Sequence, residues 1–352
     1  MMNELIAGFP GQIETSLGIA DANPLKNTLK NPSLIVISGL GGSGIGGTMV
    51  ADWSRPHAQI PVLVNKDYSL PACVNEKTLF IACSYSGNTE ETLEAVEKAR
   101  QAGASILCIT SGGELEKFAI QHGYDFRKIP GGFPPRACLG YSLTQLVDVF
   151  VWLGCLPTDY RQKMGEMIQN LRKNADYYMQ EGKKLANHLN GKMAVIYAEA
   201  SIEGMAVRFR QQINENAKDL CWHHAVPEMN HNELVGWAGG TDKLAPVLMR
   251  TSNDYPRNQT RMDIMKDIFK KYTPNTIELV AKGNRPVEQG LHLIHLTDWA
   301  SFFLSEMRQV DVMEVKVIDY LKADIIAVAA PRDAQDGIHV MDAGRADLVF
   351  DI

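Results

Sequence analysis

The chain has 352 residues, of which 45% are hydrophobic and 22% charged, as expected for a water-soluble globular protein long enough for two domains. Its formal net charge of −6 and isoelectric point near 5.9 argue against a general role in nucleic-acid binding, which depends on clustered lysine and arginine. The most strongly apolar stretch, residues 143–156, contains Gln145 and Asp148 and is too short to span a membrane.

The first half of the chain alternates between expected strands and helices. After an N-terminal helical segment, short apolar runs predict strands at 34–38, 62–65, 79–84 and 106–110. Helical patterns lie at 45–53, 88–102 and 114–122. The segment GGFPPRA at 131–137 ends this unit and is followed by an apolar helix at 138–154. Such alternation is typical of a parallel sheet with helices on both faces.

The second half repeats this pattern after a polar, charge-rich stretch at 158–190, which we interpret as one long helix at a domain boundary. Strands are expected at 193–197, 221–226, 244–249 and 276–280. Helices are expected at 201–217, 257–271 and 287–308. We therefore predict an α/β protein with two three-layer α/β/α domains, 1–155 and 156–322, and a C-terminal extension at 323–352 to which the sequence assigns no role.

Cysteine usage and the N-terminal segment favour a cytoplasmic protein. Six cysteines are scattered, mostly among apolar residues, with no C-x-x-C pair and no Cys/His spacing typical of a metal site. We interpret them as buried thiols in a reducing compartment. The N-terminal segment lacks a basic stretch followed by a long apolar one, so we expect no signal peptide.

Two small-residue loops, SGLGGSG at 38–44 and SYSGNT at 84–89, each follow an expected strand and precede an expected helix. Glycines let the backbone approach an anion, and the free N–H groups of a first helical turn stabilise negative charge without a metal. The second loop adds three hydroxyl donors, from Ser84, Ser86 and Thr89, while Asn88 or Thr89 could cap the next helix. Together the loops predict a cradle for a phosphate.

Other interpretations of these loops fit less well. The glycines of the first loop resemble a GxGxxG dinucleotide pattern only weakly, and the acidic residue expected about 20 residues later is not clearly placed. A Walker-type loop requires a lysine that neither loop has. An ordinary tight turn would explain one loop, but two loops about one βαβ unit apart favour a phosphate site.

Six motifs in a fixed order point to a family: SGLGGSG, SYSGNTEET, PPRA, NENAK at 214–218, PEMNHN at 227–232 and IDYLK at 318–322. Over residues 30–322 the chain resembles the bifunctional phosphoglucose/phosphomannose isomerases, which have two sugar isomerase (SIS) domains. This resemblance implies two SIS-type domains and the interconversion of glucose 6-phosphate, fructose 6-phosphate and mannose 6-phosphate. It also implies which residues hold the phosphate: Gly42, Ser43, Ser84, Ser86 and Thr89.

The resemblance further implies catalytic roles for four residues. Arg136 would bind beside the reacting carbons and stabilise developing negative charge, and Glu215 would move a proton between C1 and C2. His231 and Lys322 would serve ring opening and closing. In this family the histidine comes from the neighbouring subunit, so the resemblance implies a homodimer with a shared active site.

Aldose–ketose isomerisation independently requires these residue types. One carboxylate can remove and return the proton of a cis-enediol intermediate, a fixed cation stabilises the enediolate, and a histidine suits ring opening near neutral pH. The reaction requires no metal or redox cofactor. His223 and His224 precede His231 at a spacing that is not typical of metal ligands.

Two departures from the family pattern leave specificity open. Val315 and Lys316 replace a Thr-Pro pair, which puts activity on mannose 6-phosphate in doubt, and Glu233 adds a carboxylate near the expected pocket. Two alternative functions remain: another SIS-type sugar-phosphate enzyme, or a non-catalytic phosphosugar sensor. The roughly 30 residues before the first strand are too few and too weakly basic for the DNA-binding domain that such sensors usually carry.

Overall fold

The computed structural model describes residues 1–329, with side-chain surroundings up to residue 325. Residues Met1–Met313 form one compact unit, and the described residues that follow, including α13 (Lys316–Ala329), belong to a second. Each unit is described by itself. Most of the extension predicted at 323–352 lies outside the described residues.

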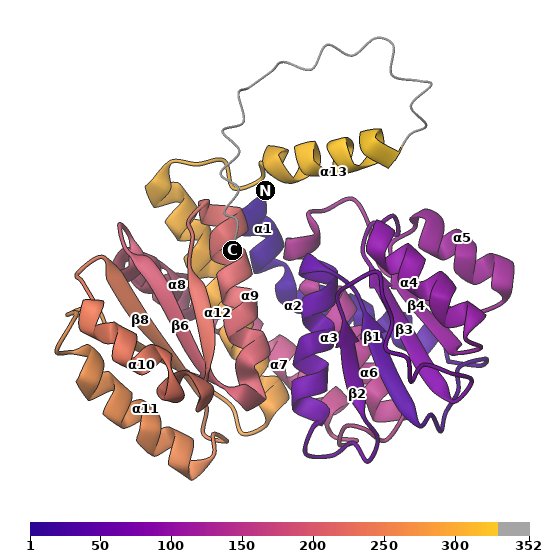
Figure 1. The fold of residues 1–352 in the computed structure, drawn as a ribbon, viewed down its shortest axis with the longest axis horizontal. Helices are drawn as coiled ribbons and strands as arrows, with labels where there is room; N and C mark the ends of the chain where they lie inside the picture. Colours follow the sequence, from indigo (N-terminus) through magenta and orange to yellow (C-terminus); the bar gives the residue numbers. More distant parts are fainter. Residues whose placement is uncertain (330–352) are drawn as a thin grey trace, which may run out of the picture. The chain divides into compact units, whose positions relative to one another are not determined.

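The first sheet has five parallel strands in the order β2-β1-β3-β4-β5 (Figure 1). Their bounds are β1 Leu34–Ser38, β2 Val62–Asn65, β3 Thr78–Ser84, β4 Ser105–Thr110 and β5 Asp125–Lys128. The first four confirm the sequence prediction to within one residue. Strand β5 was not predicted, because its sequence DFRK is largely charged; Arg127 is nevertheless buried there and pairs with Asp148 at 3.3 Å.

Helices cover both faces of this sheet, as predicted. They are α1 Met2–Ala7, α2 Phe9–Ala22, α3 Gly41–Ser54, α4 Glu90–Gln101, α5 Gly113–His122 and α6 Leu139–Trp152. Alternate strand residues point to opposite faces. In β1, Leu34 and Val36 join a cluster with α4 and α5, whereas Ile35 and Ile37 join a larger cluster with α3 and α6.

The second sheet has four parallel strands in the order β7-β6-β8-β9. They are β6 Met193–Glu199, β7 Trp222–Val226, β8 Leu244–Arg250 and β9 Ile277–Val280, each within two residues of its predicted bounds. The helices of this part are α7 Tyr160–Lys173, α8 Ala175–Leu189, α9 Glu203–Gln212, α10 Glu233–Gly236, α11 Pro256–Phe269 and α12 Pro286–Arg308. Three short 3₁₀ segments, η2 Ala200–Ile202, η4 Glu228–His231 and η5 Trp237–Gly239, and the turn η3 Ile213–Ala217 lie between the elements of this part, whereas a fourth 3₁₀ segment, η1 Pro135–Ala137, precedes α6 in the first part.

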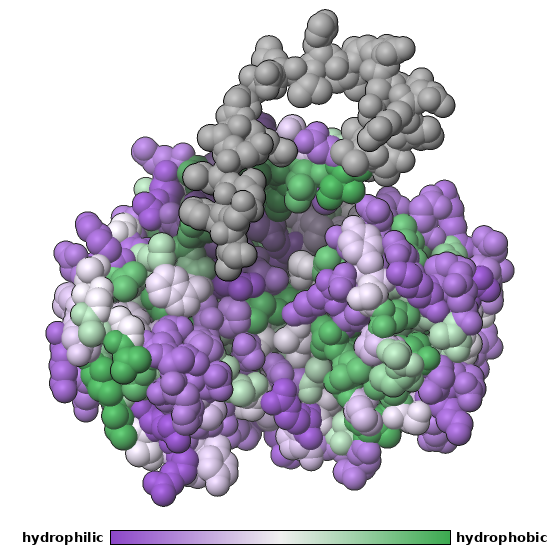
Figure 2. Space-filling view, viewed as in Figure 1, coloured by the Kyte–Doolittle hydropathy of each residue, from purple (hydrophilic) through white to green (hydrophobic). Residues whose placement is uncertain are grey.

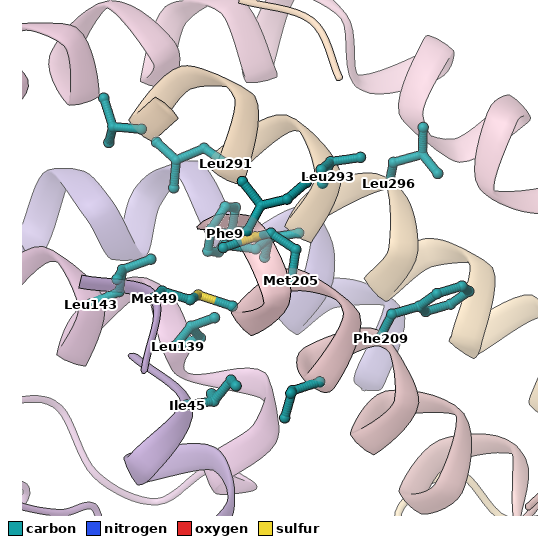
Figure 3. Packing of buried hydrophobic residues seen from close by; sticks show 14 of the residues in the cluster. Phe9, Ile45, Met49, Leu139, Leu143, Met205, Phe209, Leu291, Leu293 and Leu296 are labelled. Atoms are coloured by element: carbon teal, nitrogen blue, oxygen red, sulfur yellow. The ribbon is translucent and has the colours of Figure 1, made fainter. Parts of the chain in front are cut away.

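One hydrophobic cluster joins the inner faces of both sheets. Figure 3 shows side chains of α2, α3, α6, α9 and α12 meeting in it, among them Met49, Leu143, Met205 and Leu291. This shared core explains why residues 1–313 form one compact unit despite having two sheets. The domain boundaries predicted at 155/156 and 322/323 stay predictions.

Three expectations need correction. The long helix predicted at 158–190 is two helices, separated at Asn174, whose backbone leaves the helical region (φ −106°, ψ 24°) while its amide donates to the Asn170 carbonyl. The helix predicted at 201–217 ends in a π-helical turn, η3. The cysteines are not all buried, since Cys73 is exposed and Cys221 is half-buried.

The visible surface is largely hydrophilic, with hydrophobic residues in separate small groups (Figure 2). Among residues 1–329, no helix is both long enough and apolar enough to cross a membrane.

Candidate active site

The two predicted phosphate loops lie side by side because they follow neighbouring parallel strands, β1 and β3. The chain leaves β1 towards β2 on one side and returns as β3 on the other, so the loops meet where the strand order reverses. Ligands of open α/β sheets bind at this kind of point, outside the carboxyl ends of the strands. Helix α3 begins at Gly41 rather than at 45, so the end of the first loop forms the first helical turn. The N–H groups at the start of a helix have no acceptor one turn earlier; of those here, the Ser43 N–H already donates to the Leu40 carbonyl at 3.0 Å, which leaves the N–H groups of Gly41 and Gly42 for a ligand.

The loop hydroxyls are tied into a local hydrogen-bond network that leaves O–H groups for a ligand. The Ser43 hydroxyl oxygen accepts the Tyr85 N–H at 2.9 Å, which joins the two loops and leaves its own proton free to donate. The Ser84 oxygen accepts the Gly87 N–H at 3.1 Å and lies 2.9 Å from the Thr89 hydroxyl. When Ser84 donates to Thr89, the Thr89 proton is available to a phosphate. Ser86 is exposed, and its oxygen accepts the Asn88 N–H at 3.2 Å.

Neither Asn88 nor Thr89 caps α4 with its side chain, although the sequence suggested that one of them could. Thr89 is the N-cap of α4 but makes no side-chain capping bond. The Asn88 amide oxygen instead accepts the Glu114 N–H in the first turn of α5, at 3.0 Å. Asn88 therefore fixes the second loop to the neighbouring helix, and the Thr89 hydroxyl is not occupied by capping.

The first loop packs directly against the segment that carries Arg136. A Cβ added at Gly42 would lie 3.0 Å from the Pro135 carbonyl carbon and 3.1 Å from the Arg136 nitrogen. A small cavity of about 10 Å³, enough for one water molecule, lies at this contact. Its lining comes from both loops and from the PPRA region: Gly42, Ser43, Cys83, Ser84, Tyr85, Ile109, Ile129, Pro135, Cys138 and Ser142.

Arg136 and Glu215, far apart in the sequence, form an ion pair. The Arg136 Nη1 lies 3.3 Å from Glu215 Oε2; the arginine side chain is 4% exposed and the glutamate side chain 27%. Burial lowers the pKa of the Arg136 guanidinium, and the Glu215 carboxylate acts against this effect. Arginine stays protonated even so. The structure thus places a fixed cation beside an accessible carboxylate, and it brings together two of the residues for which the resemblance implies catalytic roles.

Polar contacts on every side hold the Arg136 guanidinium in place. Its Nε donates to the Asn216 amide oxygen at 2.7 Å, and its Nη2 donates to the carbonyls of Val312 and Met313 at 2.5 and 3.4 Å. These contacts fix the orientation of the cation and leave its Nη1 with the Glu215 carboxylate.

A second, buried layer supports this arrangement and was missed by the sequence analysis. Arg208 donates to the Arg136 carbonyl and to Asp298, both at 2.8 Å, and Ser301 lies 2.9 Å from the Asn216 amide nitrogen. Burial raises the pKa of Asp298, and Arg208 acts in the opposite direction. Asn216 stands next to Glu215 in the NENAK motif, which was a usable signal, but nothing local marks Arg208 or Asp298.

Glu215 lies in a π-helical turn, η3, which continues α9 and ends at Lys218 in the left-handed region (φ 58°). The Lys218 ammonium donates to the Glu215 carbonyl at 2.5 Å. π-Helical turns widen a helix locally and are frequent at functional sites. Here the turn presents Glu215 and Asn216 together to Arg136.

The remaining predicted residues are not brought into this cluster. His231 is exposed at the end of η4, and in the described part of the chain its side chain makes no hydrogen bond or ion pair. Lys322 is exposed on α13, in the separate second unit. Their roles in ring opening, and the supply of His231 by a second subunit, stay predictions.

Glu233, which departs from the family pattern, is engaged on the second sheet. Its carboxylate accepts from the Tyr197 hydroxyl, from Trp222 Nε1 at 3.3 Å, and lies 2.8 Å from His224 Nδ1. These bonds anchor the segment that follows His231 to β6 and β7. Among residues 1–329, no three His, Cys, Asp or Glu side chains form a group suited to a metal ion.

Comparisons with known proteins agree with the α/β fold described above. The SIS domain family matches residues 28–121, and the family described as the bacterial phospho-glucose isomerase C-terminal SIS domain matches residues 179–325. The chain is 38% identical over 331 residues to the bifunctional phosphoglucose/phosphomannose isomerase of Caldicellulosiruptor bescii, covering 91% of this chain and 98% of that protein. It is 35% identical over 325 residues to the protein of the same name from Aquifex aeolicus, covering 92% and 97%. In fold it is similar to the C-terminal domain of glucosamine-fructose-6-phosphate aminotransferase from Francisella tularensis, with a TM-score of 0.72, 15% identity and coverage of 89% and 98%.

Proposed function

Because this chain belongs to the family of bifunctional phosphoglucose/phosphomannose isomerases, we propose that it interconverts glucose 6-phosphate and fructose 6-phosphate, with Glu215 as the base. The observation that carries this proposal is the buried Arg136 guanidinium, which lies 3.3 Å from the Glu215 carboxylate and directly beside the phosphate loops. A sugar phosphate anchored at the loops would extend its reacting carbons towards this pair.

Substrate binding begins with the phosphate. The first-turn N–H groups of α3 and the hydroxyls of Ser43, Ser86 and Thr89 supply donors to its oxygens. Ser84 acts indirectly, because its oxygen is used to shape the second loop. Because the phosphate is covalently attached to the sugar, binding it at the loops sets where the reacting carbons lie in the site.

The proton then moves between neighbouring carbons. Glu215 removes the proton from C2 of the open-chain aldose, and the electrons of that C–H bond form the C1–C2 double bond of a cis-enediolate. Glu215 returns the same proton to C1 while the O2 proton passes to O1, so C2 becomes the carbonyl carbon. Arg136 stabilises the charge on the enediolate oxygen, and its bonds to Asn216 and the main chain keep it oriented throughout.

Ring opening must precede this step for a cyclic sugar. We assign it to His231 and Lys322, with His231 supplied by the second subunit of a homodimer. The exposed position of His231 and its lack of a hydrogen-bond partner among the described residues support this assignment.

The replacement of Glu215 by glutamine tests the proposed base. We expect Glu215→Gln to lower kcat by about 10²-fold or more, since an amide cannot accept the proton, while fructose 6-phosphate binding is retained. Glu181→Gln is the matched control: this glutamate is similarly exposed (34%) and also paired with a cation, Lys184, but lies on α8 outside the site. Wild-type turnover in Glu215→Gln would contradict the assignment.

Following both products from fructose 6-phosphate defines the specificity. Appearance of glucose 6-phosphate and mannose 6-phosphate would show that Val315 does not prevent activity on both epimers, and glucose 6-phosphate alone would show a narrower enzyme. Tight binding of fructose 6-phosphate without either product in the wild-type protein would contradict the proposed function and favour a sensor.

A further inference from the structure

A second cavity, of about 300 Å³, lies between α7, α8 and the start of α12 and shares no lining residue with the phosphate loops. This volume is at the lower end of those typical of small-molecule sites. The lining residues are Met167, Asn170, Asn174, Tyr177, Tyr178, Lys282, Gly283, Glu288 and His292. Because Lys282 and Asn170 are exposed, the cavity is open to solvent.

The cavity carries one cation and one anion that do not pair with each other. Lys282 Nζ lies 3.6 Å from the centre of the Tyr177 ring, a cation–π contact that holds the ammonium at the cavity. Within residues 1–329, neither Lys282 nor Glu288 takes part in an ion pair within 4.0 Å. Opposite charges that share a cavity without contact suit a ligand that carries both charges itself.

Glu288 is also held in a fixed position. Its Oε2 accepts the N–H groups of Asn284 and Arg285, at 3.0 and 2.9 Å, as part of the N-terminal cap of α12. Its Oε1 accepts no hydrogen bond from the described residues, and a carboxylate oxygen has room for more than one. The free oxygen is therefore a preorganised acceptor for an ammonium group.

His292 forms a buried part of the cavity wall. This side chain is 2% exposed, yet neither of its ring nitrogens has a hydrogen-bond partner among the described residues. Burial and the Lys282 charge lower its pKa to about 4, so at neutral pH the ring is uncharged and adds no second cation to the cavity. Both nitrogens are themselves buried, so His292 contributes only ring surface to the cavity wall, and the charges that a ligand can meet there are those of Lys282 and Glu288.

We propose that this cavity binds a free α-amino acid with an apolar side chain. The ligand carboxylate pairs with Lys282, and its ammonium group with Glu288. The thioether of Met167 and the rings of Tyr177 and Tyr178 contact the apolar side chain. The amides of Asn170 and Asn174 supply further polar contacts.

Calorimetric titration of the full-length protein tests the site, with L-leucine, L-methionine and L-phenylalanine as the probes. We expect saturable binding of at least one of them at millimolar concentration or below. The contribution of each charged group of phenylalanine is measured with an analogue that lacks it: 3-phenylpropanoate lacks the ammonium group, and phenethylamine lacks the carboxylate. Each analogue should bind about tenfold or more weakly than the amino acid, because one charged contact is lost.

Variants assign each contact. Lys282→Met should weaken amino-acid binding about tenfold or more but leave the binding of phenethylamine, which lacks the carboxylate, unchanged. Glu288→Gln should also weaken amino-acid binding about tenfold or more but leave the binding of 3-phenylpropanoate, which lacks the ammonium group, unchanged. Glu288→Gln retains an oxygen for the helix cap. Lys183→Met is the matched control, since Lys183 is an exposed lysine of α8 that also lies over an aromatic ring, that of Phe303, outside the cavity; its binding should equal that of the wild type.

Three results would overturn the proposal. The first is that the protein binds none of the three amino acids at a concentration of 10 mM, which corresponds to roughly the weakest affinity expected of a functional small-ligand site. The second is equal binding of phenylalanine and 3-phenylpropanoate, which would leave no role for Glu288. The third is an unchanged affinity in Lys282→Met, which would place the ligand elsewhere.

Discussion

Replacing Gly42 by alanine tests whether the first phosphate loop positions Arg136. An alanine Cβ would lie 3.0 Å from the Pro135 carbonyl carbon and 3.1 Å from both the Pro135 oxygen and the Arg136 nitrogen. All three are main-chain atoms, which cannot rotate away as a side chain can. The η1 segment that carries Arg136 must therefore shift by a few tenths of an ångström.

The magnitude follows from two opposing contributions to the free energy of unfolding. Overpacking of this kind costs about 1–3 kcal/mol, whereas the better helix propensity of alanine returns up to about 1 kcal/mol. Gly18 provides the matched control, because it lies inside α2 and an added Cβ there meets no atom within 4 Å. Gly18→Ala should thus stabilise the protein by up to about 1 kcal/mol, and the difference between the variants isolates the contact cost of about 1–3 kcal/mol.

The assay combines urea unfolding with steady-state kinetics on fructose 6-phosphate. We expect Gly42→Ala to lower kcat/KM about tenfold or more, because catalysis is sensitive to small displacements of a positioned group, while Gly18→Ala stays near the wild type. If the two variants change stability equally, the contact with Pro135 has no energetic weight. If Gly42→Ala is destabilised but retains full kcat/KM, the loop does not position Arg136.

Two further predictions concern buried carboxylates. Asp298→Asn should lower the free energy of unfolding by about 3–5 kcal/mol, because it leaves the buried Arg208 charge without its partner at 2.8 Å. The control is Asp267→Asn, which removes an exposed ion pair and should change the free energy of unfolding by less than about 1 kcal/mol. Urea unfolding measures both values. Burial raises the pKa of Asp52 to about 7 although its carboxylate accepts the Gly204 N–H, so the native state holds this proton more tightly than the unfolded state does. Between about pH 4 and 7, the free energy of unfolding of the wild type should therefore fall relative to that of Asp52→Asn as pH rises, by at most about 1.4 kcal/mol per pH unit. If the two proteins give parallel plots of unfolding free energy against pH, this prediction is wrong.

Strand positions were predictable because buried parallel strands are continuous apolar runs, and 34–38 matches β1 to the residue. Strand β5 escaped the same reasoning because its buried residue is Arg127, whose charge is compensated by Asp148 from α6. The break between α7 and α8 was missed for a related reason. Asn174 is a polar residue in a polar helix, and only its bond to the Asn170 carbonyl distinguishes it from its neighbours.

The candidate site was predictable to the extent that its chemistry lies in local motifs. The glycine and serine loops, Arg136 after two prolines, and Glu215 in NENAK are all short signals, and the structure places the two loops, Arg136 and Glu215 together. Arg208 and Asp298 could not be found this way, because an arginine or aspartate in a helix is usually solvated. Only the tertiary structure shows that these two are buried and paired.

The residues of the proposed reaction come from both halves of the fold, so both sheets are needed to form the site. The first sheet supplies the two predicted phosphate loops and is followed by Arg136, and the second supplies Glu215 on the turn after α9. The guanidinium of Arg136 is bonded to residues 80 and 176 positions later in the chain, so its orientation depends on contacts that exist only when both sheets share one core. Helix α12 carries Asp298 and Ser301, which hold Arg208 and Asn216. A phosphate could bind to the first sheet alone, but the cation and the base of the proposed reaction are brought together only by the folded pair.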